Sequence, residues 1–299
     1  MEVRNQHLLE RLKQGVSYTV VMNYGICQYR IYLQLQAPKS LVFPEQLRGL
    51  VLHKYLEKVM MGEPLPRISE AIRAVLHLDR EDVVKDRTTT LTTTEEKIEF
   101  LHRIKEELPS FVRACRQKKA EIEQAGLSVV SAEQGYDITL SQSHPPATVV
   151  ISCHPDLVLE GEDGLVIVDL KTGKTARNAL YGDQLVLYAS VLERITDTPC
   201  RRMEVWQWDG NSISTYSRDL TDWEKEAVLF RHAHIGSVIQ SKVAKLEDGA
   251  TPSKLFYPNT RSKFCTERAC SYHHLCPFFA EKQRRQQQLK EVNTDDTED

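Results

Sequence analysis

Apolar residues at helical spacing mark five long stretches of the chain. Between Pro44 and Met61 they recur three and four positions apart, which is the period of a helix with one buried face. The same period predicts four more helices, over Ile68–Leu78, Thr94–Ala125, Arg177–Ile195 and Thr221–Ala244. Thr93 and Glu96 can form a capping box that starts the second of these. Pro109 is expected to kink or divide that helix, because proline lacks the backbone N–H that a helix uses.

Stretches rich in β-branched residues lie between these helices and predict strands. Three strands are expected one after another, over Ser128–Leu140, Ala147–Leu159 and Leu165–Leu170. Gly161–Gly164 is a hairpin signal between the last two. Arg202–Trp208 and Ser212–Ser217 should form another pair. The order of helices, a three-stranded meander, a helix and further strands predicts an α/β fold in which helices flank a mixed central β-sheet.

Shifts in composition and pattern divide the chain into five segments. Residues 127–250 hold most of the predicted strands and form the core, and residues 63–126 precede it as a helical insertion. The N-terminal segment spans residues 1–62. After the core, residues 251–290 are basic and cysteine-rich, and residues 291–299 form an acidic tail that we expect to be disordered.

The composition is typical of a globular protein. Apolar residues make up 41% and charged residues 27% of the 299 positions. The sequence holds no run of about 18 apolar residues, so we expect no membrane span. Met1–Gly15 is typical of a polar helix rather than a signal peptide, and we therefore expect a cytoplasmic protein.

The overall charge does not indicate nucleic-acid binding, but one segment differs from the average. The net charge is −3, whereas nucleic-acid-binding domains are usually basic. Segment 251–290 holds eight lysine and arginine residues against two glutamates. Such a segment can hold phosphates locally, although a solvated helix face explains the same pattern.

Two carboxylates are expected to meet at one end of the predicted sheet. Asp156 ends the sequence His154-Pro155-Asp156, and Asp169 lies at the end of the apolar strand that follows the hairpin. The hairpin should bring Asp156 and Asp169 together, where they repel each other unless a cation intervenes. Mg²⁺ suits such a site, because it takes oxygen ligands and needs only one or two protein carboxylates.

A lysine accompanies these carboxylates. Lys171 lies two positions after Asp169, so both side chains point to the same face of the strand. A lysine in that position can orient a water molecule for attack on phosphate, or accept its proton if its own pKa is lowered, and the metal can lower the pKa of that water. An isolated Asp-x-Lys sequence is more often a surface ion pair. Its combination with Pro155-Asp156 and the hairpin favours phosphodiester hydrolysis.

Four short motifs resemble those of RecB-like nucleases in the PD-(D/E)xK superfamily. Ile167–Gly173 (Ile-Val-Asp-Leu-Lys-Thr-Gly) is similar to the third nuclease motif of that family, and Pro155-Asp156 is similar to the second. Gly49–His53 resembles the first motif, and Gln184–Tyr188 matches the family's Gln-x-x-x-Tyr motif. The resemblance covers Ser17–Phe279, and the joint order of the motifs is more specific than any one of them.

The resemblance implies a restriction-endonuclease-like core and a role for each matched residue. The implied roles are metal binding, with Mg²⁺ or Mn²⁺, for His53, Asp156 and Asp169, water positioning for Lys171, and DNA contact for Gln184 and Tyr188. The last two residues share a helix face, since they lie four positions apart. Cys153 stands where members of the family often have glycine.

Seven cysteines raise the question of a second metal site. The number is odd and the chain shows no secretion signal, which argues against a disulfide framework. Cys265, Cys270 and Cys276 follow the core, and Cys27 precedes it. RecB-like nucleases of the CRISPR-adaptation type and the AddB helicase–nuclease share this layout, in which four thiolates hold an iron–sulfur cluster. The resemblance therefore implies these four cysteines as ligands of a structural 4Fe–4S cluster.

Zinc is the alternative occupant of the cysteine site. The family usually places two residues between the first two late cysteines, whereas four separate Cys265 from Cys270. His273 and His274 could replace a thiolate in a zinc site, but the long gap before Cys276 fits zinc poorly. We favour the cluster, and we interpret the remaining cysteines as buried thiols: Cys115, Cys153 and Cys200.

One further motif is excluded. Gly173-Lys174-Thr175 resembles the end of a phosphate-binding loop, but that loop requires a glycine five positions earlier, where this chain has Val168. We therefore predict that the chain has no ATP-driven motor.

These features predict a Mg²⁺- or Mn²⁺-dependent DNA nuclease. The resemblance implies an exonuclease on single-stranded DNA ends that works with protein partners in CRISPR spacer acquisition or in DNA repair. The alternative is a non-cleaving iron–sulfur subunit that binds DNA ends within a larger complex. The presence of all four core residues, His53, Asp156, Asp169 and Lys171, favours the enzyme, and a cleavage assay with Mg²⁺, Mn²⁺ or EDTA separates the two hypotheses.

Overall fold

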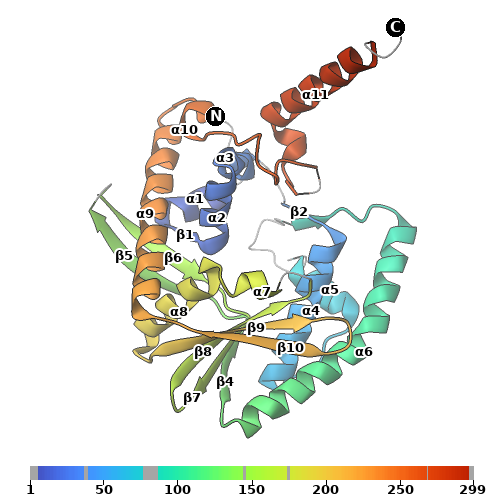
Figure 1. Cartoon of the computed structure of the whole chain (residues 1–299), viewed down its shortest axis with the longest axis vertical. Coiled ribbons are helices and arrows are strands. Elements are labelled where there is room, and N and C mark those ends of the chain that lie inside the picture. The colour runs from blue at the N-terminus through green and yellow to red at the C-terminus, as the bar shows by residue number, and fades with distance from the viewer. Residues whose placement is uncertain are drawn as a thin grey trace.

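A five-stranded mixed sheet lies at the centre of the molecule (Figure 1). The computed structural model describes residues 6–36, 40–76, 87–143, 146–173, 176–267 and 269–295. The central strands, in the spatial order β10-β9-β8-β7-β4, are β10 (Ile213–Asp219), β9 (Cys200–Trp208), β8 (Gly164–Lys171), β7 (Leu157–Gly161) and β4 (Ser128–Ala132). β8 and β9 run parallel and the other neighbours antiparallel. The predicted α/β class with a mixed central sheet is therefore confirmed.

The β7–β8 hairpin sets the geometry of the candidate site. Leu157 pairs with Val168 and Gly161 with Gly164, as the hairpin signal predicted. Every residue of β8 between its two ends is buried, which explains the nearly continuous apolar sequence of this strand. Because Leu157 faces Val168, the preceding Asp156 and the following Asp169 stand next to each other across the hairpin.

Two of the predicted strands are each divided between two sheets. The stretch Ser128–Leu140 forms β4 and then β5 (Tyr136–Ser143), and Ala147–Leu159 forms β6 (Pro146–Cys153) and then β7. β5 and β6 belong to a second sheet with the order β1-β6-β5. One break falls at Glu133, whose φ of 50° is left-handed; the other falls at Pro155, which cannot donate a ladder hydrogen bond. The predicted three-stranded meander is therefore wrong, since the chain crosses between sheets at both breaks.

The short strand β1 (Gly15–Ser17) runs parallel to β6 and brings the N-terminal segment to this second sheet. Gly15 lies opposite Val150, and a Cβ atom on Gly15 would stand 2.0 Å from the Val150 carbonyl oxygen. Only glycine allows so close an approach. The sequence at this point therefore fixes where the N-terminal helices meet the core.

Helices cover both faces of the central sheet. α4 (Pro44–Met61) and α6 (Thr94–Gln124) pack against one face, where Val168 and Trp206 are fully buried. α8 (Asp183–Thr196) and α9 (Asp222–Glu247) lie on the other side, in a core that includes Ile167 and Met203. Alternate residues of β8 and β9 thus face different helix layers, which holds the sheet on both sides.

The helix predictions are confirmed with two differences. The Thr93–Glu96 capping box forms at the start of α6, and this helix continues through Pro109 without being divided. The stretch Arg177–Ile195 contains two helices, α7 (Ala176–Ala179) and α8, because the chain turns before Gly182, the N-cap of α8. The helix predicted over Ile68–Leu78 is α5 (Ile68–Val75), and its last two predicted residues lie outside the described part. A small parallel pair, β2 (Ser40–Val42) and β3 (Arg87–Thr89), completes this side.

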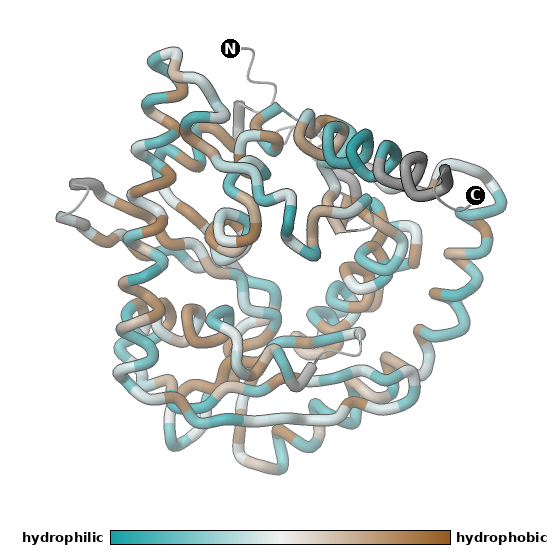
Figure 2. Tube along the Cα trace, turned by 45° about the horizontal axis from the view of Figure 1, so that its top comes forward, coloured by the Kyte–Doolittle hydropathy of each residue, from teal (hydrophilic) through white to brown (hydrophobic). Residues whose placement is uncertain are grey.

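The N-terminal helices and the segment that follows α9 lie side by side (Figure 1). The N-terminal helices α1 (Gln6–Gln14), α2 (Tyr18–Ile26) and α3 (Tyr29–Gln36) lie next to α10 (Pro252–Leu255) and the 3-10 helix η1 (His273–Leu275). Helix α11 (Pro277–Asp295) then projects from the body, and Figure 2 shows it as predominantly hydrophilic. Residues 291–295 of the predicted acidic tail belong to this helix, and residues 296–299 lie outside the described part. No helix in the described part is long and apolar enough to cross a membrane.

Candidate active site

Three side chains from different parts of the fold converge beside the β7–β8 hairpin. His53 lies on α4, Glu133 follows β4, and Asp156 precedes β7. The Nδ1 atom of His53 is 3.0 Å from Oε1 of Glu133 and 3.2 Å from Oδ1 of Asp156. One potential ligand atom from each of the three lies within 4.8 Å of the others, which is close enough to hold one metal ion.

Backbone contacts fix the orientation of these side chains. The carbonyl oxygen of Leu170 lies 3.1 Å from Nε2 of His53. The backbone N–H of Leu170 donates to Oδ2 of Asp156 at 2.6 Å. A proton on Nε2 that is donated to this carbonyl leaves Nδ1 to face the carboxylates. The backbone N–H of Glu133 donates to the carbonyl of Asp156 at 3.0 Å. The peptide groups of the hairpin therefore orient the candidate ligands directly.

Asp169 and Lys171 form an ion pair next to this group, as the spacing predicted. Nζ of Lys171 lies 3.0 Å from Oδ1 and 2.7 Å from Oδ2 of Asp169. Burial and the negative charge of Asp156 raise the pKa of Asp169 to about 6. Burial opposes the positive charge of Lys171, but the two aspartates outweigh it and raise the pKa of the lysine. The close carboxylates of Asp156 and Asp169 thus favour a positive charge beside them.

The neighbouring carboxylates also favour the protonated form of His53. Burial opposes a charged imidazole, yet Asp156 and Glu133 raise the pKa of His53 well above its ordinary value. Burial also opposes the charge of Asp156, but His53 holds the pKa of Asp156 below its usual value. Oδ2 of Asp169 is buried, and its contact with Lys171 is an ion pair rather than a well-aligned hydrogen bond. A donor set of carboxylate oxygens with one imidazole nitrogen fits a divalent metal ion.

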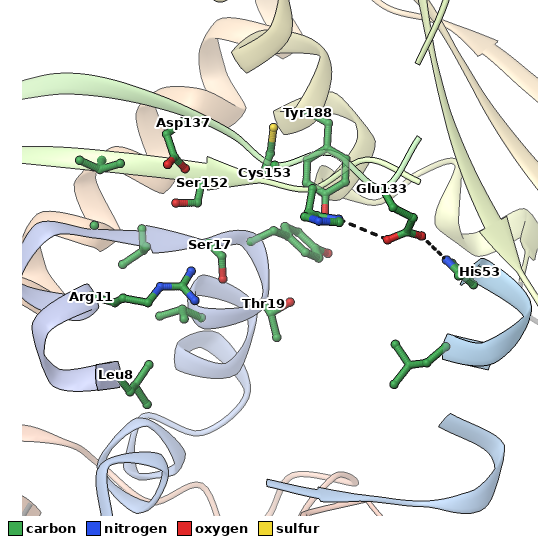
Figure 3. A pocket seen from close by; sticks show the side chains of 18 of the residues that line it. Leu8, Arg11, Ser17, Thr19, His53, Glu133, Asp137, Ser152, Cys153 and Tyr188 are labelled. Atoms are coloured by element: carbon green, nitrogen blue, oxygen red, sulfur yellow. Dashed lines mark hydrogen bonds and ion pairs between the residues drawn. The ribbon is translucent and has the colours of Figure 1, made fainter. Parts of the chain in front are cut away.

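Glu133 is a candidate ligand that the sequence patterns did not reveal. It lies at the break between β4 and β5, within a stretch that the pattern predicts as one strand. Its left-handed φ of 50° turns the chain so that the side chain meets His53, as the dashed line in Figure 3 shows. The available signal was the sequence Glu133-Gln134-Gly135, whose glycine and polar residues interrupt the strand pattern.

The Gln184 and Tyr188 pair lies on α8, as the motif predicted. The Gln184 amide Nε2 donates to the Tyr188 hydroxyl at 3.0 Å. Burial raises the pKa of the Tyr188 hydroxyl, so this side chain is a neutral phenol at physiological pH. Tyr188 lines the same cavity as His53 and Glu133 (Figure 3).

Tyr18 is a second residue that the sequence patterns missed. It begins α2, lines the cavity with Tyr188, and stacks on the buried ring of His232 with centroids 5.8 Å apart. Burial and the charge of Asp183 raise the pKa of Tyr18, and the charges of Lys171 and Asp169 act on it as well. The N-terminal segment therefore supplies an aromatic hydroxyl within the electrostatic influence of the Asp169–Lys171 ion pair.

The cavity that holds these residues has a volume of about 1150 Å³. One end is formed by α4 with His53, and the other by α1 and β1 with Arg11 and Ser17 (Figure 3). Pockets for drug-sized ligands measure roughly 300–1,000 Å³. The space therefore admits a substrate larger than a single small molecule.

The four predicted cluster cysteines lie around one small cavity of about 30 Å³, which they line. Cys27 caps α2 and Cys276 caps η1, while Cys265 and Cys270 lie in the loop before η1. Burial, followed by the charges of Cys27 and Cys270, raises the pKa of Cys276. The structure thus brings thiols from opposite ends of the sequence together, which fits the donor set of an iron–sulfur cluster.

His273 shares the cysteine cavity, whereas His274 is not among its lining residues and the other three cysteines lie elsewhere. The ring of His273 lines the cysteine cavity, with Nδ1 2.9 Å from the Cys270 carbonyl oxygen. Three cysteines outside the cavity are buried, and burial raises the pKa of each thiol to about 12: Cys115, Cys153 and Cys200. Such thiols are unreactive and fill the core.

A mixed sheet here presents two aspartates and a lysine beside a histidine from a neighbouring helix, an arrangement that could hold a divalent metal ion. The model of the PD-(D/E)XK nuclease superfamily matches residues 15–277 of this chain. The chain belongs to the PD-(D/E)XK nuclease superfamily.

Two solved structures are among those similar to the chain. One, from Eubacterium rectale, is described as a proposed exonuclease; it is 14% identical, with a TM-score of 0.44, over 84% of this chain and 88% of that chain. The other, SSO0001, is 10% identical, with a TM-score of 0.33, over 87% of this chain and 95% of that chain. No curated protein matches the chain.

Proposed function

We propose that this protein is a divalent-metal-dependent deoxyribonuclease that removes nucleotides from single-stranded DNA ends. The convergence of His53, Glu133 and Asp156 beside the Asp169–Lys171 pair carries this proposal. Membership of the nuclease superfamily supports the reaction class. The 1150 Å³ cavity next to these residues supports a polymeric substrate.

The residues have complementary roles in this proposal. His53, Glu133, Asp156 and Asp169 would hold Mg²⁺ or Mn²⁺, which lowers the pKa of water and neutralises charge on the phosphate. Lys171, held by Asp169 at 2.7 Å, orients the attacking water with its ammonium group. The Tyr188 hydroxyl, fixed by Gln184, contacts the DNA strand beside the scissile phosphate.

The cysteine site would hold a 4Fe–4S cluster with a structural role. Its four thiols come from Cys27 and from the segment 265–276, so the cluster joins the N-terminal helices to the C-terminal segment. The resemblance to nucleases of CRISPR adaptation and to AddB supports a role in spacer acquisition or DNA repair, in both cases with protein partners. Iron and zinc analysis of an anaerobic preparation tests the choice of metal.

Cleavage of end-labelled single-stranded DNA tests the enzyme proposal. We expect cutting in Mg²⁺ or Mn²⁺ and none in EDTA, and Lys171→Ala should lower the rate at least 100-fold, because general acid–base and positioning groups contribute roughly that much. Lys245→Ala, on the exposed side of α9, is the control and should cut like wild type. Cleavage retained by Lys171→Ala would contradict the proposed role of Lys171. Wild-type protein that binds DNA ends without cutting would instead support the non-cleaving subunit.

A further inference from the structure

The cavity continues well beyond the candidate metal site. From His53 and Glu133 it extends past Tyr188 to residues of α1, β1 and β6 (Figure 3). Figure 3 shows this second part between Thr19 and Arg11, on the side away from His53. This region, which we call the distal arm, is built from the N-terminal segment and the second sheet.

The walls of the distal arm carry neutral hydrogen-bonding groups. Ser17 of β1 and Ser152 of β6 are register partners, and both line the arm. Thr19 adds a third hydroxyl from the first turn of α2. Hydroxyl groups of this kind commonly contact phosphate oxygens of nucleic acids without carrying a charge themselves.

Arg11 supplies positive charge at the end of the distal arm. It lies on α1, is exposed, and its guanidinium points into the cavity in Figure 3. Among the described residues it has no ion-pair or hydrogen-bond partner. Lys13, two positions away, differs in both respects: it lies outside the cavity, and it pairs with Glu10 at 3.0 Å and with Glu247 at 2.8 Å. Arg11 is therefore free to bind an anion that enters the arm.

We propose that the distal arm binds the part of a single DNA strand that lies beyond the scissile bond, and that Arg11 holds one of its backbone phosphates. This inference rests on the proposed nuclease function. Tyr18, which is half-buried, lines the same cavity, and a base of an unpaired strand can stack on its ring. Asp137, which lines the arm beside Ser152, repels phosphate and directs the backbone to the Arg11 side.

The binding of fluorescein-labelled oligothymidine to the full chain, measured by anisotropy in EDTA, tests the inference without cleavage. We expect Arg11→Ala to weaken binding about tenfold, the loss of one hydrogen-bonded charge pair. The slope of log affinity against log salt should fall in magnitude by about 0.7, as for one phosphate contact on a single strand. Asp137→Asn should strengthen binding, because it removes a negative charge. Lys13→Ala is the matched control and should bind like wild type.

Substitution of the backbone locates the contact. Oligothymidines that carry one uncharged methylphosphonate at successive positions should lose affinity for wild type at one position, and that loss should disappear in Arg11→Ala. Equal binding by Arg11→Ala and wild type, or an equal methylphosphonate effect in both, would overturn the inference. Cleavage by wild type in Mn²⁺ is scored separately, so a nuclease whose binding ignores Arg11 refutes the distal-arm inference alone.

Discussion

At the scale of single residues, the backbone of one residue, Leu170, orients two side chains of the candidate metal site. Leu170 presents its carbonyl to His53 and its N–H to Asp156, so that two side chains far apart in sequence are oriented by the same residue of β8. Leu170 itself is buried and holds its place through the sheet. The ligands are therefore pre-oriented by a rigid strand, which reduces the entropy lost when a metal ion binds.

We predict that Glu133 contributes to metal affinity as a ligand, like His53 and Asp156. We expect Glu133→Gln to raise the dissociation constant for Mn²⁺ roughly tenfold or more, since the loss of a ligand or its partner costs about 10–100-fold in metal affinity. Calorimetric titration with Mn²⁺ measures this change. Glu160→Gln, an exposed substitution on β7, is the control and should leave the affinity unchanged. Equal Mn²⁺ affinities of Glu133→Gln and wild type would remove Glu133 from the site.

The sequence predicts those site residues whose relation is local. The sequence predicts that three side chains lie close together, those of Asp156, Asp169 and Lys171. A hairpin and the two-residue period of a strand determine which of these side chains meet. Glu133 and Tyr18 could not be predicted in this way. Glu133 lies where the chain crosses between two sheets, at a left-handed residue, and Tyr18 follows β1, whose approach to β6 depends on Gly15. Neither feature leaves a periodic signal in the sequence.

At the scale of elements, α4 and α6 brace the end of β8. Arg48 of α4 donates to the Thr172 carbonyl at 3.1 Å and pairs with Glu107 of α6. Glu107 also accepts a hydrogen bond from the indole of Trp208 on β9, at 2.5 Å. Helix periods and the capping box predicted these helices, but this three-element contact could not be predicted. It joins residues separated by more than half of the chain, and no local pattern encodes that pairing.

Removal of the charge at the centre of this brace should loosen it. We expect Glu107→Gln to lower the free energy of unfolding by about 2 kcal/mol, because hydrogen bonds to charged groups contribute about 1.5–3 kcal/mol and Arg48 would lose its nearest counter-charge. Urea unfolding measures the change. Glu106→Gln, on the exposed side of the same helix, is the matched control and should change stability by less than about 0.5 kcal/mol. Equal stabilities of the two variants would show that the brace contributes nothing.

At the scale of the whole molecule, helix α2 connects the two candidate sites. Its first residue is Tyr18, in the active-site cavity, and its C-cap is Cys27, in the cysteine cavity. The backbone N–H of Asn259 lies 3.4 Å from Sγ of Cys27, and the Asn259 side chain donates to the Ile26 carbonyl at 3.1 Å. The C-terminal segment therefore holds the far end of the helix that delivers Tyr18. The metal-site residues His53, Glu133 and Asp156 lie on other elements.

Loss of one cysteine should therefore separate DNA binding from metal binding. We expect Cys27→Ala to lose bound iron, to speed amide hydrogen exchange in α2, and to weaken binding of single-stranded DNA about tenfold. A cross-link between such distant residues contributes on the order of 5 kcal/mol through loop closure, so its loss frees the N-terminal helices. The Mn²⁺ affinity of the same variant should stay within about twofold of wild type, since α4 and the central sheet remain intact.

Cys115→Ala, which removes a buried thiol of α6, is the matched control and should keep both iron and DNA affinity. Unchanged exchange in α2 after iron loss would refute the connection through this helix, and a parallel loss of Mn²⁺ affinity would show that the cysteine site supports the entire fold rather than the N-terminal helices alone.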